Sequence, residues 1–405
     1  MSTATALRPA YREPAYLRYL AGHGTSLLGD QVWHIALSWS AVQLASPGVA
    51  GLVMTVAAVP RLALMLLGGA LADRFDARRL MIGSDLARAL VMLVAATLAF
   101  LSPSLLWLVL VALAFGIADA VFLPAAGSLQ PRLLEPAQLS SGAALHEVVG
   151  RAALLLGAPL GGLLVAVGGL PLACVVNALT FGVSMAAVAS AKPRREVEPN
   201  TEPVLASVRA GFAFLRRERV LRTVILAALV INLGFVGPMN LGVAVLSEHR
   251  GWGSVGVGLL VAGFGGGAAL GALVLLRVPL RRRLGLVVAV AALVETAAMV
   301  VMALAPTLPA AVVAAVLIGL GGAPCGVGVR TLIQARTPDA FRGRVSSVHT
   351  LCSLGVAPLA TGLFGLTVGA VGVPAAFLCS AGLELAGAAL CLLVADLRRA
   401  SIEQG

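Results

Sequence analysis

Long apolar runs alternate along the chain with short polar stretches. A helix needs roughly 20 apolar residues to cross the hydrocarbon core of a bilayer. No run alternates apolar and polar residues with the period of two that marks a membrane β-barrel, so we expect helices, which satisfy their own backbone in lipid. The pattern predicts twelve spans: 17–44, 50–72, 80–101, 105–126, 139–167, 170–190, 221–246, 255–276, 284–305, 309–333, 344–369 and 372–395.

Composition agrees with this pattern. Hydrophobic residues make up 59% of the chain and charged residues only 12%, against about 25% charged in soluble domains. The net charge of +11 comes from Lys and Arg in both termini and in alternate loops. Those loops are 72–79, 127–138, 191–222, 277–283 and 334–344. By the positive-inside rule, they and both termini are cytoplasmic. The basic residues are scattered without an aromatic platform, so we expect no nucleic-acid partner.

The single lysine, Lys192, among so many arginines is typical of a GC-rich bacterial gene. We therefore expect a multi-pass protein of the bacterial cytoplasmic (inner) membrane. The longest polar stretch divides the chain into an N-terminal bundle, 1–190, a cytoplasmic linker, 191–222, and a C-terminal bundle, 223–405. Within the linker, residues 204–222 have apolar positions at helical spacing, which predicts an amphipathic helix.

Internal repetition supports the two halves. Ala158-Pro159-Leu160 in the fifth span recurs as Ala357-Pro358-Leu359 in the eleventh. Weak internal symmetry of this kind is typical of transporters built from two related bundles.

The most informative local motif is the loop Gly69 to Arg79, which packs two Asp and three Arg between two apolar spans. Further motifs lie elsewhere: Gly29-Asp30, Pro60-Arg61, Phe115 to Ala125, Gln334 to Pro338, and Arg342-Gly343-Arg344-Val345. Together these residues resemble the major facilitator superfamily, and within it the branch that contains enterobactin-type siderophore exporters and macrolide efflux pumps. The loop departs from the superfamily pattern at Asp76 and Ala77, where Gly and Arg are usual.

The resemblance implies an all-α membrane fold of twelve helices in two pseudo-symmetric six-helix bundles. It also implies that the charged loop is a gate, with Asp73 meeting the N-terminal end of the eleventh helix when the cytoplasmic side is closed. The gating residues would be Gly69, Asp73, Arg74, Arg78, Arg79, Arg342, Gly343 and Arg344. The alternative is a simple topology anchor.

The fifth span contains a second family-like feature. Gly157, Pro159, Gly161 and Gly162 resemble the Gly-Pro signature of antiporters in this superfamily, although the Pro is displaced by one position. Small residues allow two helices to approach closely, so ordinary close packing is the alternative.

Several ionisable side chains fall at bilayer depth, where each costs about 2.5–3.5 kcal/mol. The candidates for proton coupling are Asp30, His34, Asp119, Glu147 and Arg151. Asp30 ranks first because it lies mid-span in the first helix, which lines the central cavity by resemblance, and His34 follows one turn later. The alternative for Asp30 is a permanent pair with Arg61 or Arg151. Asp119 ranks second, and the spacing of Glu147 and Arg151 permits a structural pair.

Other buried charges are expected to be satisfied locally. Glu295 and Glu384 lie on spans expected at the periphery, and polar neighbours such as Thr296 and Ser380 would partner them. Asp85 and Arg88 belong to the same pool of in-membrane charges, for which pairing is the simplest role. His146-Glu147 is not a zinc-protease motif, because Gly150 stands where the second His would be.

These features predict a secondary transporter that exports a small amphipathic or hydrophobic compound in exchange for protons. Its partners would be the lipid bilayer, protons and the small-molecule substrate, with no cofactor, no metal and no obligate protein partner. Candidate substrate-cavity residues are Trp33, Gln43, Arg61, Asn177, Asn232 and Asn240. The first alternative is a dedicated siderophore or secondary-metabolite exporter. A transporter-derived sensor or a membrane enzyme has little support, since no nucleotide loop or nucleophile constellation is present.

Overall fold

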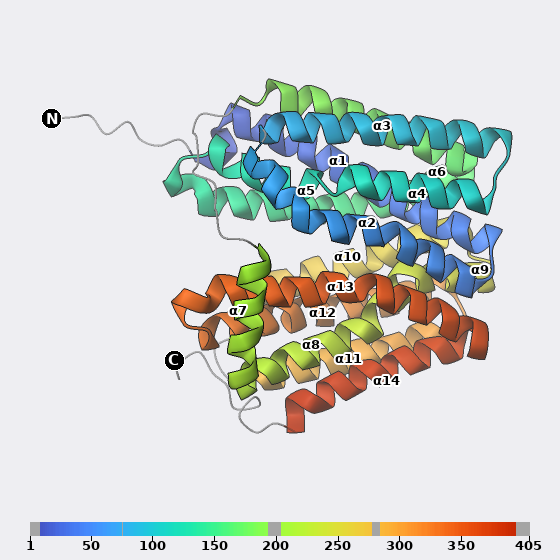
Figure 1. Ribbon diagram of the computed structural model, residues 1–405. Helices are drawn as coiled ribbons and strands as arrows, with labels where there is room; N and C mark the ends of the chain where they lie inside the picture. Colours follow the sequence, from blue (N-terminus) through green and yellow to red (C-terminus); the bar gives the residue numbers. More distant parts are fainter. Residues whose placement is uncertain (1–8, 75, 193–203, 278–283, 394–405) are drawn as a thin grey trace. The chain divides into compact units, whose positions relative to one another are not determined.

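The computed structural model describes residues 9–74, 76–192, 204–277 and 284–393, and these residues form helices and short connections (Figure 1). The α-helices are α1 (Pro14–Leu44), α2 (Pro47–Arg74), α3 (Ala77–Leu101), α4 (Leu105–Asp119), α5 (Phe122–Leu129), α6 (Leu139–Ser190), α7 (Val204–Arg217), α8 (Arg219–Gly237), α9 (Val243–His249), α10 (Gly253–Arg277), α11 (Leu284–Leu304), α12 (Leu308–Arg336), α13 (Asp339–Val371) and α14 (Val373–Leu393). Short 3-10 helices occupy Ala10–Arg12, Gln130–Leu133 and Pro136–Gln138, and a π-helical turn, Pro238–Gly242, joins α8 to α9.

The all-helical membrane fold predicted from the sequence is confirmed. Nine helical stretches in the described part of the chain are long and apolar enough to cross a membrane. One of them, Pro136–Ser190, has 55 residues and covers two predicted spans. It is broken at Gly169, whose φ of 66° and ψ of −166° are not helical. Glycine suits that position because a side chain is strained at positive φ. The predicted break at 168–171 is therefore present.

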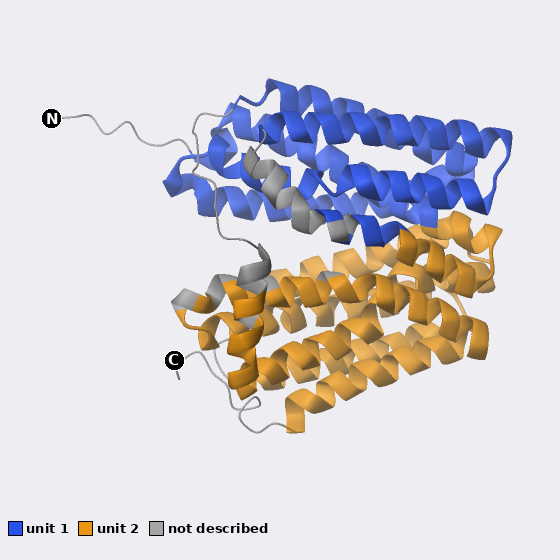
Figure 2. Cartoon of the chain, in the orientation of Figure 1, with its two compact units in different colours: residues 1–37, 57–200 blue, residues 38–56, 201–405 orange. Residues whose placement is uncertain are grey.

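Contacts divide the chain into two compact units, shown in Figure 2: unit 1 is residues 1–37 and 57–200, and unit 2 is residues 38–56 and 201–405. The end of α1 and the start of α2 thus belong with unit 2. There, the Thr55 hydroxyl donates to the Pro358 carbonyl of α13 at 2.8 Å, and Gly51 lies against Gly365, where a Cβ would be 3.1 Å from the neighbouring Cα.

In unit 1, α3 packs along α6 and α4. At one end of the unit a cluster of buried side chains includes Tyr16, Tyr19, Phe122 and Leu129. The Tyr16 hydroxyl donates to the Gly142 carbonyl at 2.6 Å and the Tyr19 hydroxyl to the Ala126 carbonyl at 3.1 Å, so both phenols are satisfied although buried. These bonds tie α1 to α5 and α6.

In unit 2, the closest helix pairs are α10 with α12 and α11 with α12, and α14 packs on α11 and α8. Gly267 of α10 and Gly319 of α12 face the partner backbone so closely that neither position has room for a Cβ. Gly372, with φ of 83°, separates α13 from α14. It occupies the place that Gly169 has in the first half, which agrees with the internal repeat.

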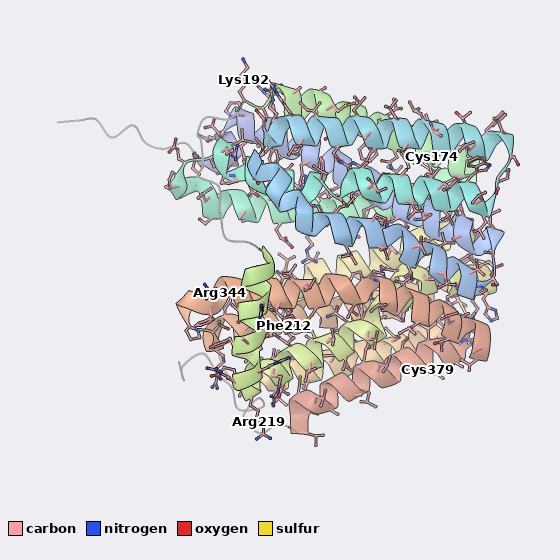
Figure 3. The ribbon with its side chains drawn as sticks, viewed as in Figure 1. Cys174, Lys192, Phe212, Arg219, Arg344 and Cys379 are labelled. Carbon is pink, nitrogen blue, oxygen red and sulfur yellow. The ribbon has the colours of Figure 1, made fainter. Side chains whose placement is uncertain are left out.

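The amphipathic helix predicted in the linker is present as α7 and is shorter than expected. It ends at Arg217, because Glu218 leaves the helical conformation before α8 begins. Leu215 is buried in the unit 2 core, whereas Phe212 is exposed (Figure 3). Phe214 stacks on Phe341 of α13, with 4.6 Å between ring centroids.

Candidate functional site

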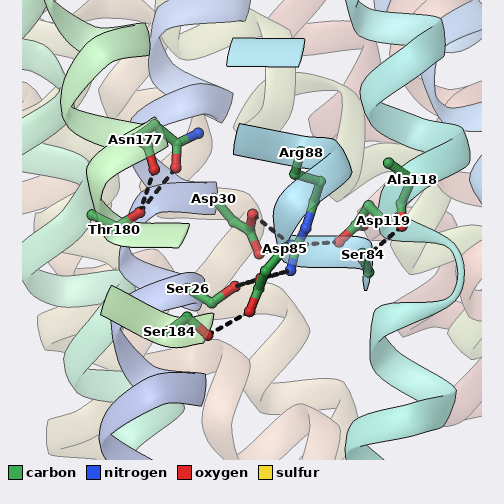
Figure 4. A network of polar contacts seen from close by, with 10 residues as sticks. All are labelled: Ser26, Asp30, Ser84, Asp85, Arg88, Ala118, Asp119, Asn177, Thr180 and Ser184. Atoms are coloured by element: carbon green, nitrogen blue, oxygen red, sulfur yellow. Dashed lines mark hydrogen bonds and ion pairs between the residues drawn. The ribbon is translucent and has the colours of Figure 1, made fainter. Parts of the chain in front are cut away.

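The polar centre of unit 1 is Arg88, near the middle of α3. Its side chain is 0% exposed. A guanidinium in such a place is costly unless its charge is compensated and its N–H groups are bonded. Residues from four other helices surround it. They supply the carboxyls and hydroxyls drawn in Figure 4, and aromatic rings.

Three aspartates from three helices bind this guanidinium. Asp85, three residues earlier on α3, accepts a hydrogen bond from Nη2 at 2.5 Å. Asp119, the last residue of α4, accepts from Nη1 at 3.0 Å. Asp30 of α1 accepts from the same Nη1 through both carboxyl oxygens, at 3.2 and 3.3 Å. One cation therefore joins α1, α3 and α4.

Two serines complete the shell around Asp85. Ser26, one turn before Asp30 on α1, accepts from Arg88 Nη2 at 3.0 Å and donates to Asp85 at 3.3 Å. Ser184 of α6 donates to the other Asp85 oxygen at 2.6 Å. Hydrogen bonds to a charged group are among the stronger ones in proteins. Asp85, 0% exposed, is thus held as an ionised partner of Arg88.

Aromatic rings cover the two faces of the guanidinium. The Arg88 Cζ lies 4.1 Å from the ring centroid of Phe122 and 4.4 Å from that of Phe181. Cation–π contacts of this kind are strongest where the cation is desolvated. Arg88 Nε has no hydrogen-bond partner among the described residues, so the rings and the two Nη atoms hold the side chain.

Three carboxyls meet at one guanidinium, so carboxylates there also repel one another where the dielectric constant is low. A proton on one carboxyl would relieve that repulsion. Asp30 is the most exposed of the three, at 13% against 0% for Asp85 and 5% for Asp119, and it makes the longest contacts to Arg88. It is therefore the carboxyl best placed to exchange a proton with water.

The structure gives Asp30 a partner that the sequence did not assign to it. Arg88 binds Asp30, and the expected pair with Arg61 is not tested. Arg151 instead pairs with Glu147 at 2.9 Å, as the spacing predicts, and the two side chains are 46% and 66% exposed. The side chain of Arg61 lies outside the described residues.

The two other candidates close to Asp30 in the sequence, His34 and Trp33, differ in their exposure. His34, one turn further along α1, is exposed. Trp33 is buried and its ring centroid lies 5.5 Å from that of Phe115 on α4.

The other candidate cavity residues belong to both units and differ in burial. Asn177 of α6 is fully buried, accepts a hydrogen bond from Thr180 at 3.1 Å, and keeps an unpartnered amide nitrogen among the described residues. Asn232 is half-buried and donates to the Ala228 carbonyl of its own helix at 2.8 Å. Gln43 and Asn240 are exposed.

The glycines of the fifth predicted span pack α6 against α1. A Cβ on Gly157 would lie 2.9 Å from the Leu28 carbonyl oxygen, and one on Gly161 would lie 3.0 Å from the Val32 Cα. Gly162 is buried in the same helix, and Pro159 stands between them. This arrangement supports the close-packing interpretation of the motif.

The charged loop is described in part. Asp76 caps α3 by accepting from the backbone N–H groups of Arg78 and Arg79, at 2.8 and 3.2 Å. Arg78 Nε also donates to the Val188 carbonyl near the end of α6, at 3.1 Å. The Arg344 guanidinium lies over the Phe341 ring, 5.5 Å from its centroid. The structure does not describe the surroundings of Gly69 and Gly343 or the side chains of Asp73, Arg74 and Arg342.

The described residues contain no group of three or more His, Cys, Asp or Glu side chains arranged to hold a metal ion.

The sequence model of the Major Facilitator Superfamily matches residues 20–360. The chain belongs to this superfamily. Membership makes the protein a multi-pass membrane transporter and not an enzyme.

Relatives within the superfamily include exporters. The multidrug efflux pump Tap of Mycobacterium tuberculosis is 30% identical over 397 residues, which cover 92% of this chain and 91% of that protein. The enterobactin exporter EntS of Shigella boydii is 25% identical over 402 residues, with 96% and 93% covered. These matches confirm the resemblance seen in the motifs.

Solved structures of the superfamily share the fold. The nucleoside transporter NupG superimposes with a TM-score of 0.74 at 14% identity, covering 94% of this chain and 98% of that one. A bacterial homologue of the iron transporter ferroportin gives 0.69 at 15% identity, with 92% and 98% covered. At these identities the likeness concerns the fold alone.

Sequence reasoning missed the centre of this site. Asp85 and Arg88 were predicted only to pair within the membrane. Asp30 and Asp119 were predicted as separate proton-coupling candidates, without a link to Arg88. The signal was available: a mid-span Arg three residues after an Asp needs further anionic partners in lipid. The hydroxyls of Ser26 and Ser184 gave no such signal, because serine is common in membrane helices for packing reasons.

Proposed function

We propose that this transporter exports a small amphipathic or hydrophobic compound in exchange for protons, by alternating access. The observation that carries the proposal is the convergence of three carboxyls on the buried Arg88, with Asp30 the most exposed of the three. The family membership and the likeness to an efflux pump support the direction of transport.

In this proposal, Asp30 is the proton carrier. When it is ionised, it shares the guanidinium with Asp119 through Nη1. When it takes a proton, its hold on Arg88 weakens, and Asp85 with its serine donors keeps the cation in place. Protonation thus changes the attachment of α1 to α3 without exposing an unpaired charge, which is what a coupling site in a rocking bundle requires.

The topology belongs to the same proposal. Basic loops on one side of the spans support cytoplasmic termini and a location in the bacterial cytoplasmic membrane. The bundles 1–190 and 223–405 would move about the linker 191–222, and the charged loop with Arg342 to Arg344 would close the cytoplasmic side. Trp33, Gln43, Arg61, Asn177, Asn232 and Asn240 remain candidate cavity residues.

The test is transport in proteoliposomes under an imposed pH gradient. A dye or drug that moves with the gradient in the wild type should stop responding to the gradient in Asp30→Asn. Glu248→Gln is the matched control, since Glu248 is an exposed carboxylate at the end of α9 in unit 2. Gradient-driven movement that survives Asp30→Asn would transfer the role to Asp119, and Asp119→Asn distinguishes the two.

A second candidate is a dedicated exporter of a siderophore or secondary metabolite. The likeness to the enterobactin exporter over nearly the whole chain supports it. Competition separates the two: a panel of unrelated cationic dyes should inhibit a multidrug pump, whereas a dedicated exporter should be insensitive to the dyes and inhibited by its own substrate, for which enterobactin is the first probe.

A further inference from the structure

Two buried carboxyl side chains lie together in unit 2, far along the sequence from the Arg88 network. Glu295 of α11 is 3% exposed and Glu384 of α14 is 0% exposed. The two helices pack along each other, and the carboxyls are close enough to interact electrostatically. No role in the proposed exchange has been given to them so far.

Neither carboxyl has the donors that an ionised form requires. Oε1 of Glu295 and both oxygens of Glu384 lack a hydrogen-bond partner within the described residues. The Thr296 hydroxyl lies beside Glu384, but its proton is donated to the Ala292 carbonyl of its own helix at 2.8 Å. Thr296 thus lies beside Glu384, as expected, with its own proton directed to the Ala292 carbonyl. That hydroxyl is able to accept a hydrogen bond from a protonated Glu384 and has no proton to offer a carboxylate.

Glycines of two neighbouring helices pack closely against the two glutamate side chains. A Cβ on Gly321 of α12 would lie 2.9 Å from Cγ of Glu295, and one on Gly234 of α8 would lie 3.0 Å from Cγ of Glu384. The carboxyl stems thus fill the space that these two glycines leave between the helices.

The other titratable groups facing the pair are thiols. Cys325 of α12 is buried and interacts with both glutamates, and the buried Cys391 of α14 lies beside Cys325. The basic residue further along α12, Arg330, faces His349 of α13. Among the described residues, no ion pair involves Glu295 or Glu384. Two ionised carboxylates in this setting would repel each other without compensation.

We infer that Glu295 and Glu384 form a second proton-binding site, located in unit 2 and separate from the Arg88 network. The pair holds protons while it is enclosed and exchanges them when water reaches it. On uptake, a hydronium ion passes its proton to a carboxylate oxygen and leaves as water, and release returns the proton to water. The inference rests on the proposed function for its place in the transport cycle, because a proton-driven exporter would then have a protonation site in each unit.

Infrared difference spectroscopy of the full-length protein in lipid tests the site without relying on transport. A shift from neutral to alkaline pH should remove the carbonyl stretch of protonated carboxyls. The part of that signal due to the pair should be missing in both Glu295→Gln and Glu384→Gln, and retained in Asp30→Asn. An unchanged signal in both glutamine variants would overturn the inference.

Thr296→Val protects the test against variants that fail to fold. It removes the Thr296 hydroxyl beside Glu384 while keeping the side-chain shape, so the carbonyl stretch of the pair should move to higher frequency with its amplitude unchanged. No movement would mean that the pair carries no proton there. A wild type that shows the infrared signal but no gradient-driven transport would reject the proposed function and retain the proton-binding site. A wild type that transports along the gradient without the infrared signal would reject the site and retain the proposed function.

Discussion

The two units keep acids inside a membrane in different ways. In unit 1, three aspartates surround one arginine, and aromatic rings and hydroxyls hold the assembly. In unit 2, two glutamates face each other with no described cation beside them. Phe181 follows Gly169 by twelve residues, as Glu384 follows Gly372. Counted from these two glycines, the ring that covers Arg88 in one half corresponds to a carboxyl in the other.

This difference shows that repeated helices do not require repeated chemistry. Compensation by a cation fixes the distances between helices, because a buried ion that loses its partner is costly. Neutralisation by a proton leaves the helices free to part, since the acid regains its charge once water arrives. Unit 1 should therefore depend on its charges for stability far more than unit 2 does.

Removal of the guanidinium should have the largest effect. Arg88→Met leaves three carboxyls without their cation, and we expect a loss of about 3–5 kcal/mol in stability. The unfolding temperature of the purified protein in detergent measures it. Arg151→Met, in an exposed pair, is the control and should change little. An Arg88→Met protein as stable as the wild type would show that the charges of unit 1 are not structural.

A smaller loss should follow from removing one donor to Asp85. Ser184→Ala deletes the 2.6 Å hydrogen bond to a buried carboxylate, which is worth about 1.5–3 kcal/mol. Ser190→Ala removes a hydroxyl from an exposed position of the same helix, bonded only to its own turn. Equal unfolding temperatures for the two variants would contradict an ionised Asp85.

Filling the space beside the glutamate pair should also destabilise. On Gly321 a Cβ would stand 2.9 Å from the Ala291 carbonyl oxygen as well as from Glu295, so Gly321→Ala should cost about 1–3 kcal/mol through overpacking. Gly326 of the same helix has open space, and alanine there should gain about 0.5–1 kcal/mol. We expect the unfolding temperature to fall below that of the wild type in Gly321→Ala and to rise above it in Gly326→Ala.

Neutral substitution of the pair itself should be tolerated. Glu384→Gln resembles the protonated side chain in shape and charge, so we expect a stability change of about 1 kcal/mol or less. The same unfolding assay applies. A loss as large as that of Arg88→Met would mean that unit 2 depends on an ionised carboxylate, and the contrast between the units would disappear.

The smallest effect is expected at the exposed pair on α6. Glu147→Gln breaks a contact between side chains that are 66% and 46% exposed, which is worth about 0.5 kcal/mol or less. The change should approach the error of the measurement in high salt. A large loss would show that this pair is enclosed in the membrane-embedded protein.

The sequence predicted the spans, the break at Gly169 and the family, because each depends on local properties of the chain. Apolar length, glycine at a turn and the Asp-Arg loop are read directly from neighbouring residues. The Glu147–Arg151 pair was predicted for the same reason, since one helical turn separates its members.

The partners of Asp30 and Glu384 were not predictable in this way. Arg88 reaches Asp30 only because the fold brings these positions of α3 and α1 together, and the sequence alone does not say which helix faces which. Thr296 lies beside Glu384 as expected, but its hydroxyl donates to the carbonyl four residues earlier in its own helix. Threonine often makes this bond in helices, and the sequence does not show whether it does so at a given position.

Gly169 and Gly372 have a consequence for how the chain is made. Each turns the backbone between two apolar helices within a single residue of positive φ, so no polar loop is available there to cross the bilayer by itself. We expect each of these helix pairs to enter the membrane as one hairpin during synthesis. For the same reason, an epitope tag inserted at either turn should block assembly, whereas a tag in the linker should be accepted.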